Sequence, residues 1–66
     1  QGIWYFYRRE FQRAWESFLM ALTLAPCEDH AHNLLDAAQH IDRVEQSKVV
    51  IGRLSTMHPD LKKLGI

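Results

Sequence analysis

The sequence has few of the residues that cross-link or interrupt a small fold. Its 66 residues include one cysteine, two prolines and three glycines. The single cysteine, Cys27, cannot form an internal disulfide, which argues against the disulfide-rich scaffolds of small secreted proteins. We therefore expect an intracellular protein, cytoplasmic or nuclear, that depends on its hydrophobic core. A chain this short buries only about 60% of its unfolded surface, so its stability is expected to be marginal.

The sequence also lacks an excess of charge and a long hydrophobic run. Eight basic and eight acidic residues give a formal net charge of zero, whereas nucleic-acid-binding proteins and polybasic membrane anchors carry a positive excess. No apolar run approaches the roughly 18 residues that cross a membrane. The N-terminal residues do not resemble a signal peptide, because charged residues occur from Arg8 onwards. We therefore expect neither nucleic acid nor a membrane as a partner.

Apolar residues recur at steps of three and four along most of the chain. This spacing predicts amphipathic helices over about residues 11–24 and 28–40. Pro26 disfavours helical geometry at the residue before it and is expected to end the first of these helices. Asp42 followed by Glu45 matches a capping box and predicts a further helix from about residue 43.

Residues 2–7 form a continuous apolar run that is rich in aromatic rings, and its spacing does not distinguish a helix from a strand. Aromatic residues favour strands, but a single strand would have no partner in an otherwise helical chain. We therefore predict a helix here. Short connections between the helices predict antiparallel hairpins, so the expected fold is all-α, with three to four helices and a short helical turn at the C-terminus.

The sequence also contains an internal repeat. Pro26 and Pro59 lie 33 positions apart, and each is expected to end a helical hairpin. When the prolines are superposed, small residues align with small ones and large with large at most positions. The aligned pairs are Ala14 with Ser47, Phe18 with Ile51, Ala21 with Leu54, and Phe11 with Val44.

The residues of the first hairpin match a known repeat pattern at fixed offsets. They are Gly2-x2-Tyr5, Ala14-x3-Phe18, Ala21 and Pro26. This pattern resembles the tetratricopeptide repeat, whose period is 34 residues. The resemblance implies a right-handed array of hairpins, with repeats over residues 1–27 and 28–59 and a C-terminal cap over 60–66. The second repeat departs from the family, with Leu35 and Leu54 where Gly and Ala are usual.

Alternating residue size predicts the core, because small residues let helices approach and large ones fill the space beside them. The predicted core residues are Gly2, Tyr5, Phe11, Ala14, Phe18, Ala21, Pro26, Leu34, Leu35, Ser47, Ile51, Leu54 and Pro59. Repeats of this kind bury their cores against neighbours, and about three are needed for stability. We therefore expect the chain to be a piece of a longer or processed protein, or to oligomerise.

Residues suited to chemistry are few and scattered. Cys27, His30, His32 and His40 are the candidate metal ligands, but His32 and His40 are two helical turns apart and cannot share one ion. No phosphate-binding loop or catalytic motif occurs. We therefore expect no metal, no cofactor and no catalytic residue, and we do not expect an enzyme.

The resemblance implies a concave groove in which a partner binds. Its expected lining is Ile3, Phe6 and Tyr7 from the first repeat and Asp29, His32, Asp36, Gln39 and His40 from the second. Members of the family that grip carboxylate tails use Lys and Asn where this chain has His32 and Asp36. A basic or apolar peptide or helix of another protein is therefore the expected ligand. The expected function is protein–protein binding, as a scaffold, co-chaperone or assembly subunit.

Two alternatives remain open at this point. The chain could be a structural cap or oligomerisation module of a larger helical subunit, in which case upstream residues of the same chain would cover Ile3, Phe6 and Tyr7. It could also be a helical nucleic-acid-binding domain, which zero net charge disfavours.

Overall fold

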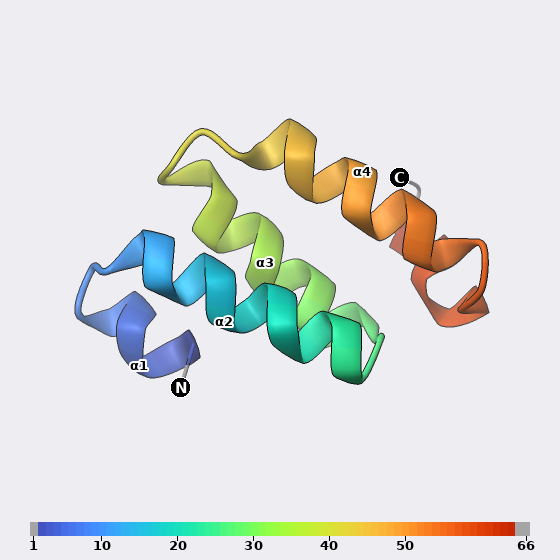
Figure 1. Ribbon diagram of the computed structural model, residues 1–66, viewed down its shortest axis with the longest axis horizontal. Coiled ribbons are helices and arrows are strands. Elements are labelled where there is room, and N and C mark those ends of the chain that lie inside the picture. The colour runs from blue at the N-terminus through green and yellow to red at the C-terminus, as the bar shows by residue number, and fades with distance from the viewer. Residues whose placement is uncertain (1, 65–66) are drawn as a thin grey trace.

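The computed structural model describes residues 2–64 as four α-helices followed by a short 3₁₀ helix (Figure 1). The elements are α1 Gly2–Tyr7, α2 Phe11–Leu24, α3 Glu28–Gln39, α4 Val44–Ser55 and η1 Pro59–Leu64. Because these residues include no strand, the predicted all-α class is confirmed. The aromatic run at the N-terminus is helical, as expected. None of the described helices has both the length and the apolar character that a membrane crossing requires.

Each helix packs against its neighbours in the chain. Helix α2 contacts α1 and α3, helix α3 contacts α4, and η1 packs on both α3 and α4. Figure 1 shows α2 with α1 on one side and α3 on the other. Because α2 lies between two other helices, its apolar positions supply much of the core.

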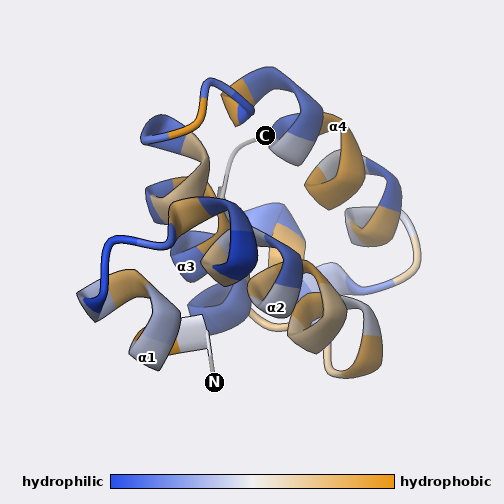
Figure 2. Ribbon diagram, turned by 60° about the vertical axis from the view of Figure 1, so that its left-hand side comes forward, coloured by the Kyte–Doolittle hydropathy of each residue, from blue (hydrophilic) through white to orange (hydrophobic). Residues whose placement is uncertain are grey.

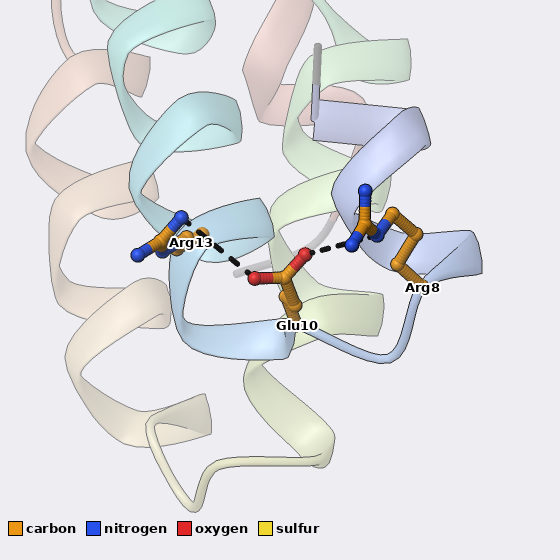
Figure 3. Close-up of polar contacts among 3 residues, drawn as sticks. All are labelled: Arg8, Glu10 and Arg13. Atoms are coloured by element: carbon orange, nitrogen blue, oxygen red, sulfur yellow. Dashed lines mark ion pairs between the residues drawn. The ribbon is translucent and has the colours of Figure 1, made fainter.

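A left-handed residue ends α1 and turns the chain into α2. Arg9 has a φ of 61°, and the amide of Glu10 donates to the carbonyl of Tyr5 at 2.9 Å. The amide of Arg9 also donates to the carbonyl of Phe6 at 3.0 Å. These bonds satisfy two carbonyls at the helix end, in the pattern usually built around a glycine. Figure 3 shows the Glu10 carboxylate between Arg8, at 3.3 Å, and Arg13, at 3.7 Å.

A left-handed residue and a backbone hydrogen bond of the same kind also end α3, 33 residues later in the chain. Asp42 has a φ of 57°, and the amide of Arg43 donates to the carbonyl of Ala38 at 3.1 Å. The predicted capping box is therefore wrong. Asp42 belongs to the end of α3, whereas Arg43 precedes α4 and makes no side-chain capping bond.

Pro26 separates α2 from α3, as expected. Helix α2 ends at Leu24, and the amide of Ala25 still donates to the carbonyl of Ala21 at 2.8 Å. The ring of His30, in the first turn of α3, donates from Nδ1 to the carbonyl of Ala25 at 2.9 Å. His30 therefore connects the end of one helix to the start of the next.

The buried apolar core is formed by α2, α3, α4 and η1. Its buried apolar residues are Ala14, Trp15, Phe18, Leu22, Ala31, Leu34, Ala37, Ala38, Ile51 and Leu61. Of these, Ala14, Phe18, Leu34 and Ile51 were predicted. Among the remaining predicted core residues, Gly2 and Ser47 are buried, and six are half-buried: Tyr5, Phe11, Ala21, Pro26, Leu35 and Leu54. The prediction for Pro59 is corrected. Pro59 begins η1 on the surface, and Leu61 occupies the buried position instead.

A buried polar bond joins the two hairpins. The indole Nε1 of Trp15 in α2 donates to the hydroxyl of Ser47 in α4 at 2.8 Å. The Ser47 hydroxyl in turn donates to the carbonyl of Arg43 at 2.8 Å. The guanidinium of Arg43 also lies over the indole ring, 5.3 Å from its centroid. Both polar groups are therefore satisfied inside the core.

Candidate functional site

A groove of about 230 Å³ lies between α1 and α3. It is lined by Ile3, Phe6, Tyr7, Phe18, Asn33 and Asp36. We call it the α1–α3 groove. Helix α1 supplies an apolar wall, α3 supplies a polar wall, and buried Phe18 reaches it from α2. An apolar surface facing an acidic one is the main chemical character of this site.

The apolar wall follows from the helical spacing of α1. Ile3, Phe6 and Tyr7 are separated by three and four positions, so they share one face of the helix. Ile3 and Tyr7 are exposed, and Phe6 is half-buried. A ligand in the groove would therefore cover apolar surface that the chain itself leaves in contact with water.

Neighbouring rings hold Phe6 in place. The rings of Phe11 and His40 are stacked, with centroids 3.9 Å apart and an interplanar angle of 9°. Phe6 meets both rings edge-on, at 5.2 Å from Phe11 and 5.6 Å from His40. Edge-on and stacked pairs of this kind each contribute about 0.5–1.5 kcal/mol. This cluster orders one part of the groove wall before any ligand binds.

The polar wall is formed by Asn33 and Asp36, which lie on the same face of α3. Asn33 is half-buried, and Asp36 is exposed. Within residues 2–64 the Asp36 carboxylate makes no ion pair, because the ion pairs there join Glu10 to Arg8 and Arg13. The carboxylate is therefore available to a positively charged group of a ligand.

The structure brings together four of the eight residues expected to line the groove: Ile3, Phe6, Tyr7 and Asp36. His40 lies next to them, stacked on Phe11 outside the lining. Asp29 lines a separate shallow depression beside Cys27 and Lys63, and His32 and Gln39 are exposed elsewhere on α3.

Sequence reasoning missed Asn33 and Phe18 as groove residues. Asn33 precedes Asp36 by three positions, which places both on one face of a helix and was the available signal. Phe18 was assigned to the core, where it is indeed 93% covered, but one side of its ring also reaches the groove.

The candidate metal ligands do not converge. Within residues 2–64, no three or more His, Cys, Asp or Glu side chains are grouped so that they could hold a metal ion. Cys27 is a half-buried free thiol in the extended residue that precedes α3. His30 bonds to a backbone carbonyl, and His40 stacks on a ring.

Comparison with models of protein families, with curated proteins and with solved structures finds no match for this chain. The sequence and geometry of the chain itself are therefore the observations that bear on its function.

Proposed function

We propose that this chain is a protein-binding module similar to tetratricopeptide repeats, and not an enzyme. Its α1–α3 groove binds a segment of a partner protein in which an apolar side chain lies close to a lysine or arginine. Such a module would serve as a scaffold, a co-chaperone or an assembly subunit.

The observation that carries this proposal is the pairing of two walls with different chemistry. Covering the exposed Ile3 and Tyr7 side chains would remove apolar surface from water, at about 25 cal/mol per Å². Asp36, on the opposite wall, would attract a cationic side chain and set the orientation of the ligand. A carboxylate tail would be repelled by Asp36, which makes a basic and apolar segment the better ligand.

Structural recurrence supports the comparison with a repeat family. The left-handed residues Arg9 and Asp42 are 33 positions apart, which is also the spacing of Pro26 and Pro59. Each of the two successive hairpins therefore has a left-handed residue between its helices and a proline after its second helix. In such a pair, α1 and α3 are equivalent helices, and the groove lies between them.

Selection from a random peptide library on the immobilised chain tests this proposal. We expect the enriched peptides to combine a large apolar residue with lysine or arginine and to bind more weakly as salt is added. Isothermal titration calorimetry with one enriched peptide then measures the effect of substitutions. Ile3→Lys and Asp36→Lys should each weaken binding by about tenfold, or 1.4 kcal/mol.

Val49→Lys is the matched control. Val49 on α4 is 54% exposed, Ile3 is 57% exposed, and the two substitutions add the same charge. Peptide affinity should be unchanged in Val49→Lys. Peptides that bind the Ile3→Lys and Asp36→Lys variants as tightly as the original chain would show that the groove is not the binding site.

A further inference from the structure

The lining of the α1–α3 groove combines aromatic rings with a carboxylate. Phe6 and Tyr7 of α1 and Phe18 of α2 supply the rings, and Asp36 of α3 supplies the carboxylate. Figure 2 shows hydrophobic segments in orange on α1 and hydrophilic segments in blue on α3. The face of an aromatic ring carries partial negative charge, so the rings and the carboxylate both attract positive charge. The groove therefore suits a cation whose surface is partly apolar.

Two of the rings are held in place by the chain itself. Phe6 meets two neighbouring rings edge-on, and the Phe18 ring lies against Gly2, where an added Cβ atom would overlap it. Tyr7 is 82% exposed, so most of its ring is available to a ligand. The inner rings are therefore positioned before a ligand binds, and Tyr7 is covered when one does.

The first cation that follows α1 in the chain is held outside the groove. The guanidinium of Arg8 lies over the Trp4 ring, 4.5 Å from its centroid, and its Nε is 3.3 Å from the Glu10 carboxylate. Trp4 and Glu10 do not line the groove. Asp36 makes no ion pair within residues 2–64. A cation from another molecule can therefore approach Asp36 without displacing one that belongs to this chain.

The volume of the groove suits a side chain. At about 230 Å³ it is smaller than the pockets of about 300–1,000 Å³ that enclose a whole small molecule. It is several times the roughly 30 Å³ that one water molecule occupies. A substituted ammonium group and part of its alkyl chain would therefore fit.

We propose that the cation bound in the groove is the side chain of a methylated lysine, and that dimethyllysine binds best. This inference rests on the proposed function, because it specifies the basic residue of the partner segment. Aromatic rings that surround a methylated ammonium group bind it through its charge and its methyl groups together. The three rings and the carboxylate of the α1–α3 groove supply both kinds of contact.

The preference for methylation follows from hydration. An unmodified lysine ammonium is strongly hydrated and has three N–H donors, which aromatic walls satisfy poorly. Each methyl group replaces one N–H and keeps the positive charge. Dimethyllysine retains one N–H, which can donate a charge-assisted hydrogen bond to Asp36. Trimethyllysine has no N–H, so it would keep the contacts with the rings but lose this bond.

A titration followed by nuclear magnetic resonance tests the site without a peptide. The probes are the N-acetyl amides of dimethyllysine and of unmodified lysine. We expect the N-methyl protons of the first probe to shift upfield on binding, because they would lie over ring faces. The signals of Tyr7 and Asp36 should shift as well. The unmodified probe should bind about tenfold more weakly.

Isothermal titration calorimetry measures the same preference in a peptide. One lysine-containing peptide from the library selection is synthesised with zero, one, two or three methyl groups on that lysine. The dimethyl form should bind about tenfold more tightly than the unmodified form, and the trimethyl form should lie between them. An analogue with carbon in place of the trimethylated nitrogen keeps the shape without the charge. It should bind more weakly than the trimethyl form.

Substitutions in the chain test the roles of the ring and the carboxylate. Tyr7→Leu keeps an apolar side chain but removes a ring, and should reduce the preference for dimethyllysine about fivefold. Tyr7→Phe should retain the preference. Trp4→Leu is the matched control, because it removes another exposed ring of α1 that lies outside the groove lining. Asp36→Ala should abolish the advantage of the dimethyl form over the trimethyl form. Circular dichroism verifies that each variant keeps its helices.

Several results would overturn the inference and leave the proposed function intact. They are equal affinities for unmodified and dimethylated lysine in the peptide, and a preference that survives Tyr7→Leu. A trimethyl form that binds as tightly as the dimethyl form would overturn the preference for dimethyllysine. Groove signals that remain unchanged at about 10 mM dimethyllysine probe would also overturn the inference. Conversely, a chain that selects no peptide but binds this probe through Tyr7 and Asp36 would contradict the proposed function alone.

Discussion

At the scale of single residues, two glycines in helices have opposite surroundings. A Cβ atom added to Gly2 would overlap the ring of Phe18, whereas a Cβ added to Gly52 meets nothing within 4 Å. Gly2 is therefore needed for the close approach of α1 to α2. Gly52, in α4, has no such role and only costs helix stability.

Alanine substitutions at these two positions should thus have opposite effects. Gly2→Ala forces the Phe18 ring or α1 to move and should lower the free energy of unfolding by about 1–3 kcal/mol. Gly52→Ala should raise it by up to about 1 kcal/mol. Urea denaturation monitored by circular dichroism measures both. Equal effects at the two sites would contradict the close contact between Gly2 and Phe18.

At the scale of the elements, both hairpin turns use a residue other than glycine in the left-handed region. Arg9 follows α1, and Asp42 follows α3. This conformation costs most residues about 1–2 kcal/mol, although Asp tolerates it better than residues with longer side chains. The hydrogen bonds at each helix end offset this cost.

Glycine at these positions should therefore stabilise the fold. We expect Arg9→Gly to raise the free energy of unfolding by about 1 kcal/mol and Asp42→Gly to raise it by less. In a domain of this size, 1 kcal/mol corresponds to an increase in Tm of about 4–8 °C. Arg53→Gly, inside α4, is the control and should lower Tm. A fall in Tm for Arg9→Gly would exclude a left-handed residue at this turn.

At the scale of the whole molecule, the bond between Trp15 and Ser47 joins the two hairpins. The pair is separated by 32 positions in the chain, and both side chains are buried. Ser47→Ala would leave the indole N–H without this partner in the core. A buried donor that loses its partner costs about 1–3 kcal/mol.

A double-mutant cycle measures this bond. Ser47→Ala should lower the free energy of unfolding by about 1–3 kcal/mol in the original chain, and by clearly less in a Trp15→Phe background, where no indole N–H is present. Chemical denaturation of the four proteins gives the coupling energy. Additive effects would indicate that the bond does not contribute to stability.

Local patterns were enough to predict the helices and part of the core, including Ala14, Phe18, Leu34 and Ile51. Apolar spacing located α2, α3 and α4, and the lack of a strand partner was a sufficient reason to expect α1 as a helix. Residue size was enough to place Gly2 and Phe18 in the core, although it did not predict that they would contact each other. The left-handed turns were missed, because neither Arg9 nor Asp42 is a glycine, and at Asp42 the capping pattern was misleading.

The groove was predicted only in part, because its shape depends on how α1 and α3 lie across α2. Repeat spacing was sufficient for the apolar wall and for Asp36. The spacing of the repeat did not predict that His40 would stack on Phe11. It also did not predict that Asn33 would line the groove in place of His32. The partner of the Trp15 indole, 32 positions away, was likewise beyond what local periodicity predicts.

The packing of each helix on its neighbours in the chain also bears on how fast the protein folds. Contacts that are short in sequence require little loop closure before they form, and helical proteins dominated by them fold in microseconds to milliseconds. Each hairpin can therefore assemble early and by itself. The Trp15–Ser47 hydrogen bond joins residues 32 positions apart and is expected to form late, so its loss should accelerate unfolding and leave the folding rate nearly unchanged.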